Sequence, residues 1–133
     1  MRGLCEEGMA IARRILIVDD QKGVRRLLEE LFKQEGWEVG SASDGLEAIE
    51  KVGQAKPDLI LMDVKMPNMN GLDATQAILR HHPDLPIIMM TAYGEIEVAK
   101  KALEAGVKKC ISKPFDIMVL KDMVNKVDCE RVQ

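Results

Sequence analysis

Five polar side chains suggest the chemistry that this 133-residue chain could perform. They are Asp19, Asp20, Asp63, Thr91 and Lys113. Each stands at or just after the end of a short apolar segment, so one fold could bring them together. Three converging carboxylates repel one another, which raises carboxyl pKa values and destabilises the fold unless a cation joins them. Oxygen ligands without His or Cys favour Mg²⁺ over zinc, with water completing the coordination shell.

Asp63 is the predicted nucleophile, because it stands alone whereas Asp19 and Asp20 form a pair suited to holding a metal. A carboxylate beside a dication, a hydroxyl and an ammonium is arranged for in-line attack on a phosphoryl group. Thr91 would donate a hydrogen bond to a phosphoryl oxygen. Lys113 would pair with the phosphoryl charge, or with Asp63 before transfer. Taken singly, the aspartates and the threonine could instead be helix caps or loop residues.

The elements that would position these residues follow from the apolar pattern. Continuous apolar segments are typical of strands buried on both faces of a parallel sheet. They cover residues 15–18, 59–62, 86–90 and, more weakly, 107–111, and a more polar segment at 38–42 suits an edge strand. Helical stripes lie between and after them, over 24–32, 46–52, 72–78, 96–103 and 117–127.

The helix ends carry their own signals. We expect Asp44 to cap the second helix, Pro83 to end the third and Gly106 to end the fourth. The stripe at 96–103 has few large side chains, so this helix is expected to dock most weakly. Strand and helix alternation predicts an α/β fold, a doubly wound parallel (βα)5 sheet with the flavodoxin-like strand order 2-1-3-4-5. In such sheets ligands bind beyond the carboxyl ends of the strands.

Composition narrows the function classes. Apolar residues make up 47% and charged residues 31%, with a net charge of −3, which is typical of a globular domain without the positive field that non-specific nucleic-acid binding needs. No apolar run approaches the ~18–20 residues of a membrane span. The three cysteines are widely spaced and lack a CxxC pair, an unpaired set that fits a reducing compartment. We therefore expect a cytoplasmic protein, a monomer that binds neither nucleic acid nor membrane.

Four motifs, in this order along the chain, resemble those of bacterial response-regulator receiver domains. They are Ile-Leu-Ile-Val-Asp-Asp at 15–20, Pro-Asp-Leu-Ile-Leu-Met-Asp-Val-Lys-Met-Pro-Asn-Met-Asn-Gly at 57–71, Met-Thr-Ala-Tyr-Gly at 90–94 and Ser-Lys-Pro-Phe at 112–115. The resemblance covers about residues 13–127, so we expect a receiver domain there, a flexible N-terminal extension at 1–12 and a C-terminal tail at 128–133.

The resemblance implies a defined chemistry. Asp63 would take a phosphoryl group from the phosphohistidine of a sensor histidine kinase. Asp20, Asp63 and the backbone carbonyl of Lys65 would ligate Mg²⁺, with Asp19 acting through water, and Mn²⁺ or Ca²⁺ could substitute. A cis peptide bond is implied before Pro114. The domain would be a phosphotransferase only in transferring the phosphoryl group onto itself, and not a conventional turnover enzyme.

A narrower resemblance is to the stand-alone carriers of sporulation phosphorelays. It rests on Asp-Asp-Gln-Lys-Gly-Val-Arg at 19–25, Thr-Ala-Tyr-Gly-Glu at 91–95 and Lys-Pro-Phe-Asp-Ile at 113–117. It implies a second partner, a histidine phosphotransferase that receives the phosphoryl group. Receivers that switch an output mostly carry Tyr or Phe three residues before the lysine, where this chain has Cys110, which favours a carrier over a switch.

Partner docking must bring a histidine to Asp63, so the residues around that site form the predicted partner-binding rim. The rim residues are Gln21, Gly23, Val24, Leu27, Tyr93, Pro114 and Phe115. Two other functions stay open. A chemotaxis-like output regulator would bind a target protein when phosphorylated. A flavodoxin-like cofactor binder is disfavoured, because Asp19 and Asp20 stand where a glycine-rich phosphate loop would be needed.

Overall fold

The computed structural model describes residues 13–92 and 94–131. Within them, strands and helices alternate along the chain. The elements are β1 (Arg14–Val18), α2 (Lys22–Gln34), β2 (Glu38–Ala42), α3 (Gly45–Gln54), β3 (Leu59–Asp63), α4 (Gly71–His81), β4 (Ile87–Ala92), α5 (Ile96–Ala105), β5 (Lys109–Lys113) and α6 (Ile117–Arg131).

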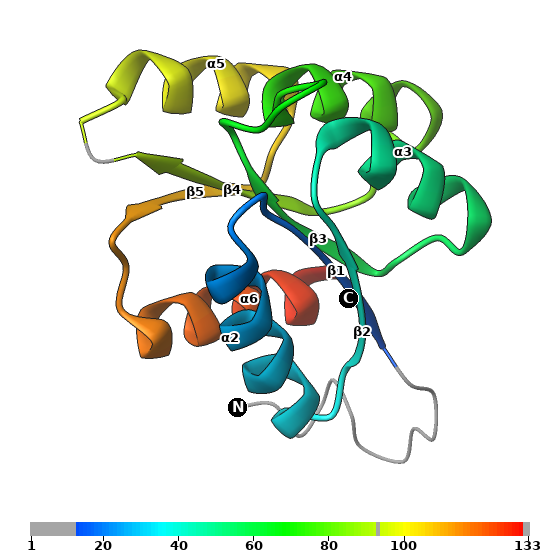
Figure 1. Cartoon of the computed structure of the whole chain (residues 1–133), viewed down its shortest axis with the longest axis vertical. Coiled ribbons are helices and arrows are strands. Elements are labelled where there is room, and N and C mark those ends of the chain that lie inside the picture. Colours follow the sequence, from blue (N-terminus) through cyan, green and yellow to red (C-terminus); the bar gives the residue numbers. More distant parts are fainter. Residues whose placement is uncertain (1–12, 93, 132–133) are drawn as a thin grey trace.

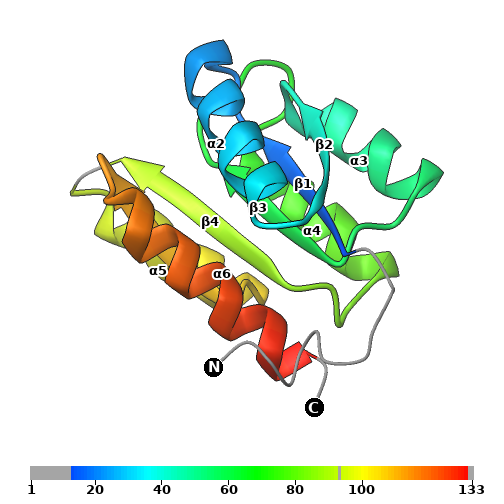
Figure 2. The same ribbon diagram turned by 90° about the horizontal axis from the view of Figure 1, so that it is seen from below.

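The five strands form one parallel sheet in the order β2-β1-β3-β4-β5. Helices α3, α4 and α5 cover one face, and α2 and α6 cover the other (Figure 1). The view from the α2 and α6 side shows both helices in front of the strands (Figure 2). The predicted fold class and strand order are confirmed.

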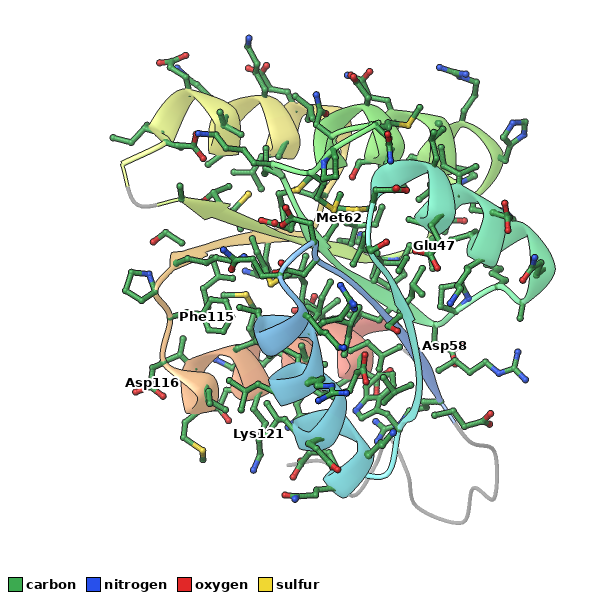
Figure 3. The ribbon with its side chains drawn as sticks, in the orientation of Figure 1. Glu47, Asp58, Met62, Phe115, Asp116 and Lys121 are labelled. Carbon is green, nitrogen blue, oxygen red and sulfur yellow. The ribbon has the colours of Figure 1, made fainter. Side chains whose placement is uncertain are left out.

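Two cores flank the sheet, because successive strand residues point to opposite faces. Ile15 and Ile17 pack with residues of α2 and α6, whereas Leu16 and Val18 pack with residues of α3 and α4. Met62 of β3 lies in the second core (Figure 3). Burial on both faces explains why β1 and β3 are continuously apolar, and the more exposed β2 alternates as an edge strand does.

The site residues predicted at the strand ends lie there in the structure. β4 and β5 continue past the apolar segments, pairing Thr91 with Ser112 and Ala92 with Lys113. β4 ends one residue after Thr91, the residue predicted to end it. Asp63 and Lys113 are the last residues of β3 and β5, as predicted, and their backbones are held by the sheet.

The predicted helix ends are confirmed, and one predicted helix face is wrong. The Asp44 side chain caps α3 by accepting from the Glu47 N–H, and Gly106 ends α5 with φ +115°. The α5 stripe was expected to face the core. Instead Ile96 is 75% exposed and Leu103 is 51% exposed, and Ala102 is the buried residue of this helix. A small contact residue lets α5 lie on the sheet without burying the larger side chains at its two ends.

A second cluster lies at the amino end of the sheet. The guanidinium of Arg13 forms an ion pair with the buried carboxylate of Asp128 and lies 4.5 Å from the ring centroid of Trp37. Trp37 in turn packs edge-on against Phe32, with 6.5 Å between ring centroids. We call Arg13, Trp37 and Asp128 the amino-end cluster. It ties α6 to the beginning of β1.

Three further findings concern the chain as a whole. Helix α6 ends at Arg131, beyond residue 127, and the expected extension at 1–12 lies outside the described residues. Cys110 is a free thiol, but Cys129 is disulfide-bonded, so the expectation of an unpaired set is wrong for Cys129. Of the helices in the described ranges, none has the length and apolar character needed to cross a membrane.

Candidate functional site

Three carboxylates meet at the carboxyl edge of the sheet. Asp19 and Asp20 follow β1, and Asp63 ends the adjacent strand β3. One oxygen from each lies within 4.8 Å of the others. Asp19 and Asp63 are buried, whereas Asp20 is exposed. The convergence expected from the strand ends is present, with one of the three acids open to solvent.

Backbone contacts fix the position of Asp19. Its Oδ1 accepts from the Gln21 N–H at 2.8 Å, its carbonyl accepts from the Arg25 guanidinium at 2.7 Å, and its own N–H donates to the Ala42 carbonyl at 3.1 Å. The N-cap position of α2 is Gln21, and no side-chain hydrogen bond caps that helix. The alternative that the two aspartates merely cap α2 is therefore wrong.

Lys113 joins the acids from the opposite side. Its Nζ donates to Asp19 Oδ2 at 2.7 Å and lies 3.4 Å from Asp63 Oδ1. The following peptide bond, to Pro114, is cis, as expected. Burial alone would lower the pKa of Lys113, but the hydrogen bond to Asp19 and the charge of Asp63 outweigh burial and raise it. The ammonium therefore stays charged at neutral pH.

Asp63 carries the strongest electrostatic strain of the site. Burial raises its pKa first, and the charge of Asp19 adds to the effect, while Lys113 opposes it. The result is a pKa of about 6 in place of the usual 3.8. One ammonium does not neutralise three carboxylates, so the site attracts a further positive charge.

The donor set fits a magnesium ion. Carboxylate oxygens at this spacing are hard ligands, and the exposed side of Asp20 leaves room for the waters that Mg²⁺ retains. Lys65, whose carbonyl was implied as a ligand, lies in the loop after β3 and lines the same cleft as Asp20 and Asp63. A dication here would relieve the repulsion that raises the pKa of Asp63.

The loop that carries Lys65 is held tightly against β3 and α3. The Gly71 N–H donates to the Val64 carbonyl at 2.7 Å, and a Cβ at Gly71 would lie 2.0 Å from the Asp63 carbonyl oxygen. Asn68 adopts φ +67°, and its Nδ2 donates to Asp44 Oδ2 at 2.7 Å. Sequence reasoning missed this anchoring. The Asn and Gly residues of the 57–71 motif, types that tolerate tight turns, were the available signal.

Thr91 is buried near the end of β4, beside Asp63's strand. The next residue, Ala92, donates its N–H to Glu95 Oε1 at 3.0 Å. Glu95 Oε2 lies 3.1 Å from Lys65 Nζ. Glu95 is also the N-cap residue of α5, so the alternative that Thr91 caps this helix is wrong. Sequence reasoning did not single out Glu95, because a lone acid in a loop carries no pattern.

A cleft of about 750 Å³ opens over Asp63. Five of the predicted rim residues line it, namely Gln21, Val24, Leu27, Pro114 and Phe115. Phe115 lies in the β5–α6 connection, on the α2 side of the sheet (Figure 3). Gly23 is exposed in the first turn of α2 and does not line the cleft. The remaining rim residue, Tyr93, falls outside the described residues.

The comparisons with known proteins place the chain in a family. The family described as the response regulator receiver domain matches residues 15–125. The chain belongs to this family. It is a receiver domain of two-component signalling. Receiver domains bind Mg²⁺ at an aspartate cluster, and this one has such a cluster in Asp19, Asp20 and Asp63.

Individual relatives include a sporulation phosphotransferase and chemotaxis proteins. The receiver domain is 41% identical to sporulation initiation phosphotransferase F of Bacillus subtilis over 113 residues, which cover 85% of this chain and 91% of the relative. It is 40% identical to the chemotaxis protein CheY of Thermotoga maritima over 118 residues, which cover 88% of this chain and 98% of the relative. A solved complex of CheX and CheY with BeF3 and Mg²⁺ from Borrelia burgdorferi matches with a TM-score of 0.83 and 31% identity, covering 88% of this chain and 90% of that one.

The receiver domain has a small side chain at position 110, three residues before Lys113. Cys110 of β5 is half-buried, and its thiol donates to the Ala99 carbonyl of α5 at 3.7 Å. Burial raises the pKa of this thiol, so it stays protonated at neutral pH. A cavity of about 320 Å³ lies beside it, lined by Thr91, Ala92, Gly94, Glu95, Ile96, Ala99 and Ser112.

Proposed function

We propose that Asp63 accepts a phosphoryl group from the phosphohistidine of a sensor histidine kinase, and that the receiver domain then relays it to a histidine phosphotransferase. The observation that carries the proposal is the place of the Asp63 carboxylate in the open cleft, with Asp19 and Lys113 beside it. A carrier must expose one acceptor to two partners in turn. An open cleft over a buried carboxylate meets that requirement.

The transfer step uses the side chains around Asp63. An Asp63 carboxylate oxygen attacks phosphorus as the bond from phosphorus to the imidazole nitrogen breaks, and the nitrogen keeps the bonding electron pair. Lys113, already 3.4 Å from Asp63, pairs with the phosphoryl charge. The Thr91 hydroxyl donates to a phosphoryl oxygen. Relay to the second partner is the same exchange in reverse, so the aspartyl phosphate is an intermediate and not an end product.

Asp19, Asp20, Asp63 and the carbonyl of Lys65 would hold the Mg²⁺ that this exchange requires. When bound, the ion neutralises the charge that accumulates between the carboxylates and the phosphoryl oxygens. Asp19 already accepts from Lys113 and from the Gln21 N–H, so it orients the neighbouring groups and would contact the ion only through water. Asp20, which is exposed, would bind the ion directly.

The apolar side of the cleft is the proposed partner-binding surface. Leu27 is 50% exposed on α2, and Val24 and Phe115 are half-buried beside it. Apolar side chains next to a charged pocket suit packing against a helical bundle that carries the reactive histidine. We include Gln21, Gly23, Tyr93 and Pro114 in this surface, and we place the exchange in the cytoplasm with the receiver domain as a monomer.

The carrier role is favoured over an output role by Cys110. Position 110 carries a thiol, so this position has no large ring that could change rotamer to report phosphorylation. The similarity to a sporulation phosphotransferase supports the same choice and suggests sporulation as the signalling context. The similarity to chemotaxis proteins favours the second candidate, an output regulator whose phosphorylated form binds a target protein.

Phosphotransfer tests the proposal. Phosphorylated sensor kinases are mixed with the receiver domain and Mg²⁺, and a histidine phosphotransferase is then added. We expect label to pass to the receiver domain and onward, and Asp63→Asn to accept none. Asp84→Asn is the matched control, because Asp84 is exposed on a loop away from the cleft. Transfer that survives in Asp63→Asn contradicts the proposal. Label that stays on Asp63 and promotes target binding favours the output regulator.

A further inference from the structure

Glu95 links two loops at the mouth of the cleft. One carboxylate oxygen accepts from the Ala92 N–H at 3.0 Å, and the other lies 3.1 Å from Lys65 Nζ. The Glu95 side chain is 20% exposed, whereas that of Lys65 is 75% exposed. The Lys65 hydrogen bond and the Ala92 N–H together lower the pKa of Glu95, so it is an anion at neutral pH.

Both partners of Glu95 are hydrogen-bond donors that line the same cleft as the phosphoryl-acceptor carboxylate. Lys65 comes two residues after Asp63, and Ala92 directly follows Thr91. Ala92, Glu95 and Lys65 line the same cleft as Asp63. A backbone N–H and an ammonium are the groups that bind phosphoryl oxygens in proteins. In the unphosphorylated protein a carboxylate already holds them.

We propose that Glu95 is an internal anion, which occupies the Ala92 N–H and the Lys65 ammonium until oxygens of an incoming phosphoryl group displace it. This inference rests on the proposed phosphorylation of Asp63. A phosphoryl group carries more negative charge and more acceptor oxygens than a carboxylate, so it competes well for both donors. In the unmodified protein the Glu95 contacts must break before the phosphoryl group binds, which lowers the affinity for that group.

Once displaced, the Glu95 carboxylate has other hydrogen-bond donors close to it, the free backbone N–H groups at the start of α5. Glu95 is the N-cap residue of α5, and no side chain caps that helix in this structure. An acidic N-cap side chain can accept from the free N–H groups of the first helical turn. Phosphorylation would therefore move Glu95 from the cleft to α5, the helix that buries Ala102 and leaves Ile96 exposed. Two alternative partners make the loop a two-state element.

The plainer explanation is that Glu95 only braces the two loops in the shape that phosphorylation needs. The two explanations predict opposite effects. If Glu95 is a brace, removing its carboxylate weakens binding of a phosphoryl-like anion. If Glu95 is a competitor, removing the carboxylate strengthens that binding, because Ala92 and Lys65 become available without a prior exchange.

Beryllofluoride with Mg²⁺ serves as the phosphoryl-like probe, and its affinity is measured by titration followed by ¹⁵N-amide NMR. Glu95→Gln removes the charge, and Glu95→Ala removes the acceptor as well. We expect both variants to bind the probe about three- to tenfold more tightly than the unmodified protein, as removal of a competing charged hydrogen bond allows. Glu97→Gln is the matched control, since Glu97 is an exposed acid in the first turn of α5, and its affinity should not change.

The Ala92 amide signal gives a readout independent of affinity. In the free protein it should shift when Glu95 is replaced and not when Glu97 is replaced. In the probe complex it should be the same in all four proteins, because the amide then donates to the probe. Equal or weaker binding by the Glu95 variants, or an Ala92 signal that still reports Glu95 in the complex, overturns the inference. If the unmodified protein fails to bind the probe at all, the proposed function fails with it.

Discussion

The two ends of the sheet each hold a buried aspartate against a cation, with opposite electrostatic outcomes. At the amino end, Asp128 pairs with Arg13, whose guanidinium also lies over Trp37. At the carboxyl end, Asp19 pairs with Lys113, but Asp63 lies 3.4 Å from the same ammonium and Asp20 lies nearby. The Arg13 guanidinium pairs with one aspartate, whereas the Lys113 ammonium is shared by two.

The difference separates a structural contact from a functional one. A buried ion pair with matched partners holds elements together, and it becomes costly only when one partner is removed. A site with excess like charge is strained until a ligand relieves it. The amino-end cluster therefore stabilises the fold. At the carboxyl end, repulsion among the carboxylates lowers the stability of the fold and raises the affinity of the site for cations. The following predictions test that contrast.

The largest effect is expected at the amino end. Arg13→Ala removes the guanidinium that pairs with the buried Asp128 carboxylate and lies over Trp37, which should lower the free energy of unfolding by about 3–5 kcal/mol. Urea unfolding followed by circular dichroism measures it. Arg14→Ala is the control, because the Arg14–Glu38 pair is exposed and 3.7 Å long, so its loss should cost below about 1 kcal/mol. Equal losses in the two variants would contradict the structural role of the cluster.

At the carboxyl end, backbone packing should be the next most sensitive feature. Gly71→Ala places a Cβ 2.0 Å from the Asp63 carbonyl oxygen, so the β3–α4 loop must shift, at a cost of about 1–3 kcal/mol in unfolding free energy and with weaker Mg²⁺ binding. Gly23→Ala meets nothing within 4 Å and lies in α2, so it should stabilise by about 0.5–1 kcal/mol. A stable Gly71→Ala protein with unchanged Mg²⁺ affinity would refute this account of the loop.

The strain on Asp63 predicts a pH dependence in the presence of a metal chelator. The pKa of Asp63 is raised from 3.8 to about 6 in the folded protein. Between these two pH values the folded state therefore holds a proton on Asp63 that the unfolded state has released. The contribution of this carboxyl to stability is full below about pH 4 and is lost as pH rises through about 6. Its size is about 1–3 kcal/mol, from a shift of about two pKa units with partial solvent access.

The difference in unfolding free energy between Asp63→Asn and the unmodified protein isolates this carboxyl from the others. The asparagine variant should gain relative stability between about pH 4 and about pH 6 and hold it above that range. A difference that does not change with pH would show that Asp63 is not strained.

Much of the fold and of the site could be predicted from the sequence. The signals were apolar segments typical of buried strands and residue types typical of helix ends. The apolar segments at 15–18 and 59–62 predicted two central strands, and two adjacent parallel strands bring their carboxyl ends together. That topology alone places Asp19 near Asp63. Asp44 and Gly106 could be predicted as helix ends because capping depends on local chemistry.

The rest depends on contacts that no periodic pattern records. Glu95 reaches Lys65 across two loops, and Arg13 reaches Asp128 across the whole sequence. The exposed face of α5 was mistaken for a core face, because Ile96 and Leu103 have the right spacing but lie at the ends of a helix that packs through Ala102. Three-dimensional packing decides such cases, and it overrides the amphipathic pattern.

The central claim is that crowded carboxylates at the carboxyl end bind a dication and thereby ready Asp63 for phosphoryl transfer. Urea unfolding at pH 7 of the unmodified protein and Asp63→Asn, each with chelator and with Mg²⁺, tests it most directly. The account predicts that Asp63→Asn is the more stable protein in chelator. It predicts that Mg²⁺ at about thirtyfold its dissociation constant stabilises the unmodified protein by about 2 kcal/mol and the variant by much less. An unmodified protein that is the more stable in chelator, or an equal response of both proteins to Mg²⁺, would contradict the claim.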